Sequence, residues 1–191
     1  TASSTIVHMI RNSPRGFKSS HSRIVFGVSV GDILQSCGIF LGPFAVPKDT
    51  PDSPMAFGTF TTCDVTGFLT LSGSSTSVLY LLLLIFFFWR RVQHRVSPQK
   101  FAYGEERYLH VSIWIISLTF PSLVLAKKGF NPTRKGTLCF LGSYPNGCGG
   151  NVEDDNYIEC TRGQDISIVS MFTGGLIVAC LLLLFLLLAS I

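Results

Sequence analysis

Long apolar stretches alternate with polar segments along this chain. Residues 65–89 and 166–191 run for 25 and 26 positions without Asp, Glu, Lys, Arg or His, and residues 24–46 and 108–126 contain one such residue each. A helix needs about 20 mostly apolar residues to cross a hydrocarbon core of about 30 Å. The pattern therefore predicts four membrane-spanning helices, one in each of these ranges.

The composition supports this interpretation. Charged residues make up 14% of the chain, against about 25% in an ordinary soluble domain. The chain begins at Thr1 and ends at Ile191 within an apolar run, and we expect residues 1–10 to be the end of a further, partial helix. The predicted fold class is an all-α integral membrane protein, with residues 1–191 as a single transmembrane domain fragment.

Basic residues are unevenly distributed over the polar segments. The segment before residue 24 and the segment 90–107 together hold nine Lys or Arg and two Glu residues. The segments 47–64 and 127–165 together hold six basic and eight acidic residues. Because an excess of Lys and Arg marks the cytoplasmic side, the first two segments are predicted to lie inside and the other two outside. The net charge of +4 then reflects membrane topology, and we expect no nucleic-acid partner.

Four of the six cysteines fall in the segments predicted to lie outside, namely Cys63, Cys139, Cys148 and Cys160. An even number of cysteines in an oxidising compartment indicates disulfides, here two bonds with three alternative connectivities. A zinc site is the competing interpretation, but the sequence has no CxxC pair. The remaining two, Cys37 and Cys180, fall within spans, where cysteine behaves as a small apolar residue.

Several short motifs occur in a characteristic order. They are Ser29–Leu34 (SxxDIL), Pro47–Pro51, Cys63 followed by Gly67 and Phe68, Ser75–Ser77 with Tyr80, Trp114 with Pro121, and Cys160–Gly163. This order resembles the second to fifth helices of seven-helix G-protein-coupled receptors, closest to the divergent protist group related to cyclic AMP receptors and secretin-type receptors. The resemblance covers nearly the whole chain. It implies an incomplete seven-helix bundle, an extracellular ligand and a heterotrimeric G protein as partner.

The resemblance also implies how the outer cysteines pair. In these receptors an outer-loop cysteine bridges to the outer end of the third helix, where Cys63 lies here. Cys139 and Phe140 match the Cys-Trp position of the related group. We therefore expect the disulfides Cys63–Cys139 and Cys148–Cys160, and the alternative joins Cys63 to Cys160 and Cys139 to Cys148.

Asp32 is the one carboxylate predicted to lie well inside a span. A charged group at this depth is costly, so it usually faces the bundle interior and pairs or hydrogen-bonds there. Asp32 is therefore a candidate intramembrane switch between receptor states. The alternative is a static anchor that bonds to Ser or Thr of the neighbouring span.

The second span carries an unusually polar run of hydroxyl-bearing residues, of which Ser72, Ser75, Thr76 and Tyr80 are singled out. Small and hydroxyl-bearing side chains permit close approach of helices. The run is therefore either a ligand-lining face or a packing seam. Trp114 and Pro121 lie seven residues apart and share one helix face, and we expect them to act in packing and in a kink.

The predicted inner side carries the candidates Arg90, Arg91 and Arg95. They would contact a G protein or anionic lipid, or act only as topology determinants. His110 is interpreted as an interfacial anchor at the inner end of its span. The sequence shows no Gly-rich phosphate loop, no nucleophile–base pair and no metal-ligand spacing, so we expect neither an enzyme nor a cofactor.

The function predicted is that of a signalling receptor in the plasma membrane, with membrane lipid, an unknown extracellular ligand and a G protein as partners. The alternative is a four-span, tetraspanin-like interaction protein. That class has a Cys-Cys-Gly motif and a very short inner loop. Here only Gly147–Gly150 (GCGG) occurs, and the segment 90–107 is long and basic.

Overall fold

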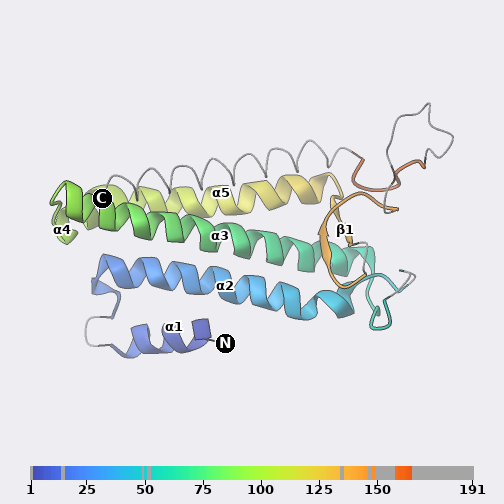
Figure 1. Cartoon of the computed structure of the whole chain (residues 1–191), viewed down its shortest axis with the longest axis horizontal. Helices are drawn as coiled ribbons and strands as arrows, with labels where there is room; N and C mark the ends of the chain where they lie inside the picture. The colour runs from blue at the N-terminus through green and yellow to red at the C-terminus, as the bar shows by residue number, and fades with distance from the viewer. Residues whose placement is uncertain are drawn as a thin grey trace. The chain divides into compact units, whose positions relative to one another are not determined.

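A computed structural model describes residues 2–13, 16–48, 50, 53–133, 136–145, 148 and 158–164. The fourth predicted span, 166–191, lies outside the described residues. The elements are the helices α1 (Ala2–Asn12), η1 (Gly16–Lys18), α2 (Ser20–Ala45), α3 (Phe60–Gln93), α4 (Pro98–Phe101), η2 (Ala102–Glu106) and α5 (Arg107–Ala126), and the strands β1 (Phe130–Pro132) and β2 (Cys139–Leu141). Figure 1 labels the helices α1 to α5 and the strand β1.

Three helical stretches are long and apolar enough to cross a membrane: α2, α3 and the continuous run Pro98–Ala126 formed by α4, η2 and α5. The helices predicted in 24–46, 65–89 and 108–126 are thus confirmed. Apolar side chains such as Val78 of α3 and Ile115 of α5 are exposed, whereas several Ser and Thr residues of the same helices are buried. Soluble proteins seldom expose large contiguous apolar surfaces, so this distribution fits a lipid-facing exterior.

The sequence explains where α3 begins and where α5 ends. At the start of α3, the Thr59 amide donates to Thr62 Oγ1 (2.7 Å) and the Thr62 amide donates to Thr59 Oγ1 (3.4 Å). This reciprocal pattern satisfies free amides of the first turn. At the end of α5, Lys128 has a positive φ of 52°. The Gly129 amide donates to the Val124 carbonyl oxygen (3.0 Å), which closes the helix with a Schellman-type turn.

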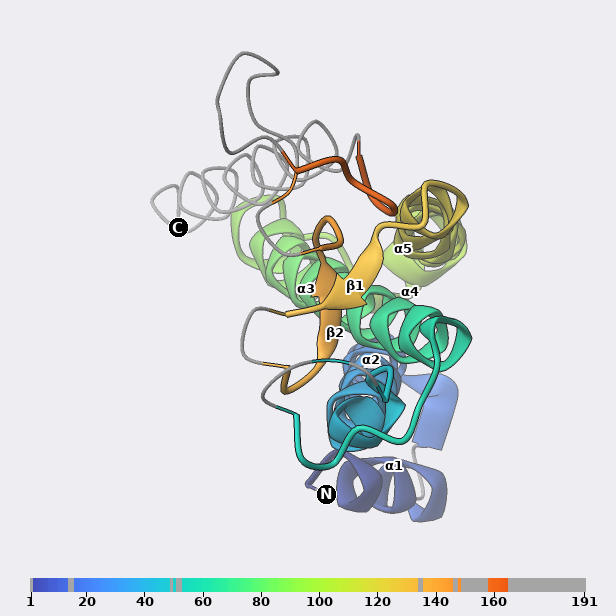
Figure 2. The same cartoon turned by 90° about the vertical axis from the view of Figure 1, so that its right-hand side faces the viewer.

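The segment after α5 contains a short β-hairpin that the all-α prediction did not include. β1 and β2 pair antiparallel, with Phe130 opposite Leu141 and Pro132 opposite Cys139 (Figure 2). Gly136 lies between the two strands and has a positive φ of 61°, a conformation that glycine adopts readily in tight turns. The described residues are therefore mainly helical with one two-stranded sheet.

The described residues fall into two compact units. The first unit comprises the chain up to Ile33 together with Gly73–Leu118, and the second comprises Leu34–Ser72 together with the described residues from Thr119 onward. The core of the first unit consists of Ile24, Tyr80, Leu83, Phe87, Phe101 and Ile113. The second unit has two clusters, one of Val46, Ala56, Cys63 and Cys139 and one built on Leu71, Val124 and Phe130.

Candidate functional site: polar contacts between helices

Asp32 of α2 accepts hydrogen bonds from two other helices of the first unit. Ser77 Oγ of α3 donates to Asp32 Oδ1 (2.7 Å), and Ser3 Oγ of α1 donates to Asp32 Oδ2 (3.3 Å). Both carboxylate oxygens are therefore hydrogen-bonded, which offsets part of the cost of placing a charge inside a span. A serine of the neighbouring span is the kind of partner that the anchor interpretation expects, and the switch interpretation also requires such a contact.

The helices α2 and α3 approach closely beside Asp32. A Cβ atom placed on Gly31 would lie 2.5 Å from Ser77 Oγ and 2.9 Å from the Gly73 carbonyl oxygen. Small residues allow such backbone approach and bring polar side chains of two spans within hydrogen-bonding reach. Gly31 therefore positions Ser77 against Asp32.

The four residues singled out on α3 occupy different environments. Thr76 and Tyr80 of the first unit are buried, with 0% and 2% exposure. Ser72 of the second unit is also buried, and its hydroxyl donates to the Phe68 carbonyl oxygen one turn earlier (2.7 Å). Ser75 is half-buried. The Tyr80 hydroxyl forms a hydrogen bond with His110 of α5.

A chain of hydrogen bonds runs from Tyr80 through three further side chains of the first unit. Tyr80 Oη lies 2.9 Å from His110 Nδ1, and His110 Nε2 lies 3.2 Å from Glu106 Oε1. Arg23 of α2 donates two hydrogen bonds to the same carboxylate, from Nε to Oε1 (2.7 Å) and from Nη2 to Oε2 (2.8 Å). This bidentate geometry is the strong form of an arginine–carboxylate pair. The network joins α2, α3, η2 and α5.

The sequence analysis did not foresee this network. It assigned Glu106 to an inner loop and His110 to an interfacial anchor, whereas Glu106 is 2% exposed and lies in the helical run Pro98–Ala126. Glu106 ends η2, a five-residue π-helix, and such wide turns are frequent at functional sites. The spacing of four residues between Glu106 and His110 places both on one helix face and is the signal that could have revealed the pair.

The three arginines expected on the inner side have distinct surroundings. Arg90 forms an ion pair with Glu105. The guanidinium of Arg91 lies 5.8 Å from the centre of the Phe87 ring, within the range of a cation–π contact. Arg91 and Arg95 are exposed. Charges at the surface remain available to a partner or to lipid headgroups.

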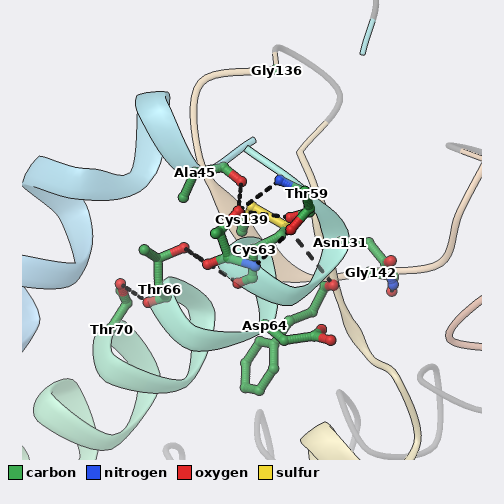
Figure 3. The surroundings of a disulfide bond; sticks show 12 residues. Ala45, Thr59, Cys63, Asp64, Thr66, Thr70, Asn131, Gly136, Cys139 and Gly142 are labelled. Carbon is green, nitrogen blue, oxygen red and sulfur yellow. Dashed lines mark hydrogen bonds between the residues drawn. A yellow bond between two sulfur atoms is a disulfide. The ribbon is translucent and has the colours of Figure 1, made fainter. Parts of the chain in front are cut away.

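The structure has the two disulfides implied by the resemblance, Cys63–Cys139 and Cys148–Cys160, with Cα atoms 5.3 and 5.2 Å apart. Figure 3 shows Cys63 on the first turns of α3 bonded to Cys139 at the start of β2. Cys63 and Cys139 are both buried. The bond therefore fixes the hairpin to α3 within the second unit, and the alternative connectivity through Cys160 is not the one formed.

Arg162, which the sequence places in the motif Cys160–Gly163 without a role of its own, is a further site residue. Its Nη2 donates to Asp64 Oδ1 of α3 (2.6 Å), and its Nε donates to Asn131 Oδ1 of β1 (3.0 Å). Its guanidinium also lies 4.7 Å from the centre of the Phe60 ring. Arg162 therefore ties the end of the described loop to the same region of α3 that carries the disulfide.

The remaining predicted residues lie within α5. Trp114 is half-buried in the first unit, and Pro121 is fully buried in the second unit. Among the described residues, no group of three or more His, Cys, Asp or Glu side chains is placed to hold a metal ion.

We compared the chain with known proteins by sequence and by structure. No family model, no curated protein and no solved structure matches it. What this protein does is therefore inferred from its own residues and contacts.

Proposed function

We propose that this protein is a transmembrane signalling receptor of the G-protein-coupled type that responds to an extracellular ligand. The observation that carries the proposal is the disulfide between Cys63 of α3 and Cys139 of β2. In the receptors that the chain resembles, this bond holds an outer loop to the third helix. Here Phe130 of the same hairpin packs against Leu71 and Val124, so the loop is held by packing as well as by the covalent bond.

The polar contacts between helices also support a signalling role. Asp32 with Ser77, and Glu106 with Arg23, join side chains from separate helices. A small shift of one helix relative to another would break or exchange such contacts, as in known switching transitions. A ligand that binds one arrangement more tightly would shift the population of states. Buried polar pairs of this kind are costly unless they are satisfied, which favours a functional role for them.

The segment between α3 and α5 argues against the tetraspanin-like alternative. That class has a very short inner loop, whereas here α4 and η2 occupy this segment. They bury Phe101 and Glu106 in the first unit. An ordered inner segment with exposed basic residues is a surface to which a cytoplasmic protein can bind.

The proposal is tested by nucleotide exchange on G proteins. The full chain in lipid nanodiscs would be mixed with stimulatory, inhibitory and phospholipase-coupled heterotrimers, and GTPγS binding would be compared with that over empty nanodiscs. We expect severalfold faster binding with at least one heterotrimer. The double variant Arg91→Glu/Arg95→Glu is expected to abolish the gain, because both side chains are exposed on the predicted inner side.

Lys48→Glu serves as the matched control, since Lys48 is equally exposed but lies in a predicted outer segment. It should leave exchange unchanged. The proposal would be overturned if no heterotrimer showed faster nucleotide exchange and none co-purified with the chain. An equal loss of nucleotide exchange in the Lys48→Glu variant would also overturn it.

A further inference from the structure

The donors and acceptors around His110 fix the direction of each hydrogen bond in its chain. The Glu106 carboxylate, held by two Arg23 donors, is ionised and only accepts. In the neutral imidazole, His110 Nε2 therefore carries the proton in the bond to Glu106, and Nδ1 accepts from the Tyr80 hydroxyl. The hydrogen bonds then run from Tyr80 to His110 to Glu106.

His110 can be reached by protons from outside the protein. A shallow depression of about 340 Å³ is lined by Arg23, Ala102, Glu106, Arg107, His110 and Val111. The side chain of His110 is 25% exposed, whereas that of Glu106 is 2% exposed. The imidazole is therefore the more accessible partner of this pair.

We infer that His110 is a proton-binding site whose occupancy changes the contacts between α2, α3 and α5 in the first unit. Imidazole is the side chain that changes charge between about pH 5 and 8. Binding of a proton at Nδ1 turns that nitrogen from an acceptor into a donor. Tyr80 Oη would then receive a hydrogen bond from His110, and its own proton would lose its acceptor in a buried position. Tyr80 or His110 must rotate to relieve this.

Protonation of His110 also affects the hydrogen bond at Nε2, the other ring nitrogen. His110 Nε2 and Arg23 Nε both donate to the same atom, Glu106 Oε1. A charged imidazole is a stronger donor than a neutral one, so it competes with Arg23 for this oxygen. The ionisable groups that face His110 are Arg23 from α2, Tyr80 from α3, Glu106 from η2 and its neighbour Arg107 on α5. The one carboxylate among them is already paired with Arg23, so the added positive charge repels the Arg23 guanidinium.

Trp114 is a built-in reporter for this change, because it lies four residues after His110 on the same face of α5. The chain has two tryptophans, and the other, Trp89, has its ring centre 4.6 Å from that of His94. The variant Trp89→Phe of the full chain in nanodiscs therefore leaves Trp114 as the only tryptophan. We expect its emission to follow a single-proton transition as the pH is lowered. His110→Gln should abolish the transition, and Tyr80→Phe should reduce its amplitude at least twofold.

His94→Gln and His21→Gln are the matched controls, and both should retain the full transition. A flat titration in the Trp89→Phe parent, an unchanged transition in His110→Gln, or full amplitude in Tyr80→Phe would each overturn the inference. Circular dichroism verifies that each variant is folded. If His110→Gln does not fold, nitrogen-15 spectra of the histidine-labelled wild type provide the test. One of the four histidines should then be the Nε2–H tautomer at pH 8 and should titrate. If none of them does, the inference is overturned.

Discussion

At the scale of single residues, two carboxylates within the described apolar helices, Asp32 and Glu106, are hydrogen-bonded rather than isolated. Asp32 accepts hydrogen bonds from Ser77 and Ser3, and Glu106 is held by Arg23. A buried polar atom left without a partner costs about 1–3 kcal/mol. Loss of the partner of either carboxylate is therefore expected to lower the stability of the protein. Substituting one of these side chains and measuring stability and signalling separately distinguishes a structural role from a signalling role.

We predict that Asp32→Leu lowers the free energy of unfolding by about 1–3 kcal/mol, because the Ser77 and Ser3 hydroxyls lose their acceptor. Asp32→Asn keeps an acceptor and should lose less than about 1 kcal/mol. Equilibrium unfolding in mixed micelles of dodecyl sulfate and a mild detergent measures both. If Asp32→Leu were as stable as the wild type and behaved like it in the G-protein exchange assay, neither the anchor nor the switch interpretation would stand.

At the scale of the elements, two features of the helices place the polar side chains. α2 and α3 approach closely at Gly31, and the π-helix η2 precedes α5 and carries Glu106. A π-helical turn rotates the residues that follow it relative to a regular α-helix. The faces that meet in the first unit are therefore set by backbone geometry as well as by the apolar pattern.

Gly31→Ala should destabilise the protein by about 1–3 kcal/mol through overpacking. The added methyl carbon would lie 2.7 Å from the Ser77 amide nitrogen and 2.9 Å from the Gly73 carbonyl oxygen, both backbone atoms that cannot move independently. Gly104→Ala is the matched control, since no atom lies within 4 Å of a Cβ there. Its stability should be unchanged or up to about 1 kcal/mol higher from helix propensity. Equal unfolding free energies for the two variants, measured in the same mixed micelles, would refute the close approach.

At the scale of the whole molecule, covalent links and charge distribution constrain the chain over long distances in sequence. Cys63 and Cys139 are 76 residues apart, whereas Cys148 and Cys160 are 12 apart. The cost of closing a loop rises with its length. The two disulfides are therefore expected to differ in their effect on stability.

Removing the longer link with Cys63→Ser/Cys139→Ser should cost about 4.5 kcal/mol, and Cys148→Ser/Cys160→Ser about 3 kcal/mol, on the chain-entropy estimate. Unfolding of the two double variants measures the difference. A peptide map without reduction should show Cys63 joined to Cys139. A fragment that joins Cys63 to Cys160, or a larger loss from the shorter link, would contradict the expectation.

The orientation in the membrane is predicted from the Lys and Arg excess and is tested by thiol labelling in intact cells. Cys37→Ser/Cys180→Ser removes the two cysteines outside the disulfides, and a single cysteine is then introduced at Gln99 or at Thr137. Both positions are exposed. An impermeant maleimide should label Thr137→Cys in intact cells and Gln99→Cys only after permeabilisation. Labelling of Gln99→Cys in intact cells would reverse the predicted topology.

Much of the helical framework could be predicted from the sequence. Absence of charge over the length of a membrane span is a local and continuous property, so it predicts the helices in 24–46, 65–89 and 108–126. The helices observed are Ser20–Ala45, Phe60–Gln93 and the run Pro98–Ala126, so the main differences are earlier starts. The predicted compartment of the cysteines rests on the same charge distribution. The pairing of Cys63 with Cys139 came from the resemblance to receptors, since spacing alone leaves three connectivities open.

The residues that meet across helices were decided only by the tertiary structure. Arg23 and Glu106 are 83 positions apart, and Tyr80 and His110 are 30 apart. Apolar periodicity shows which residues belong to a helix, but it does not show which side chains of two helices face each other. That depends on close approach at positions such as Gly31 and on the turn of η2. The hydrogen-bond chain through His110 therefore exists because folding places four side chains from separate elements within reach of one another.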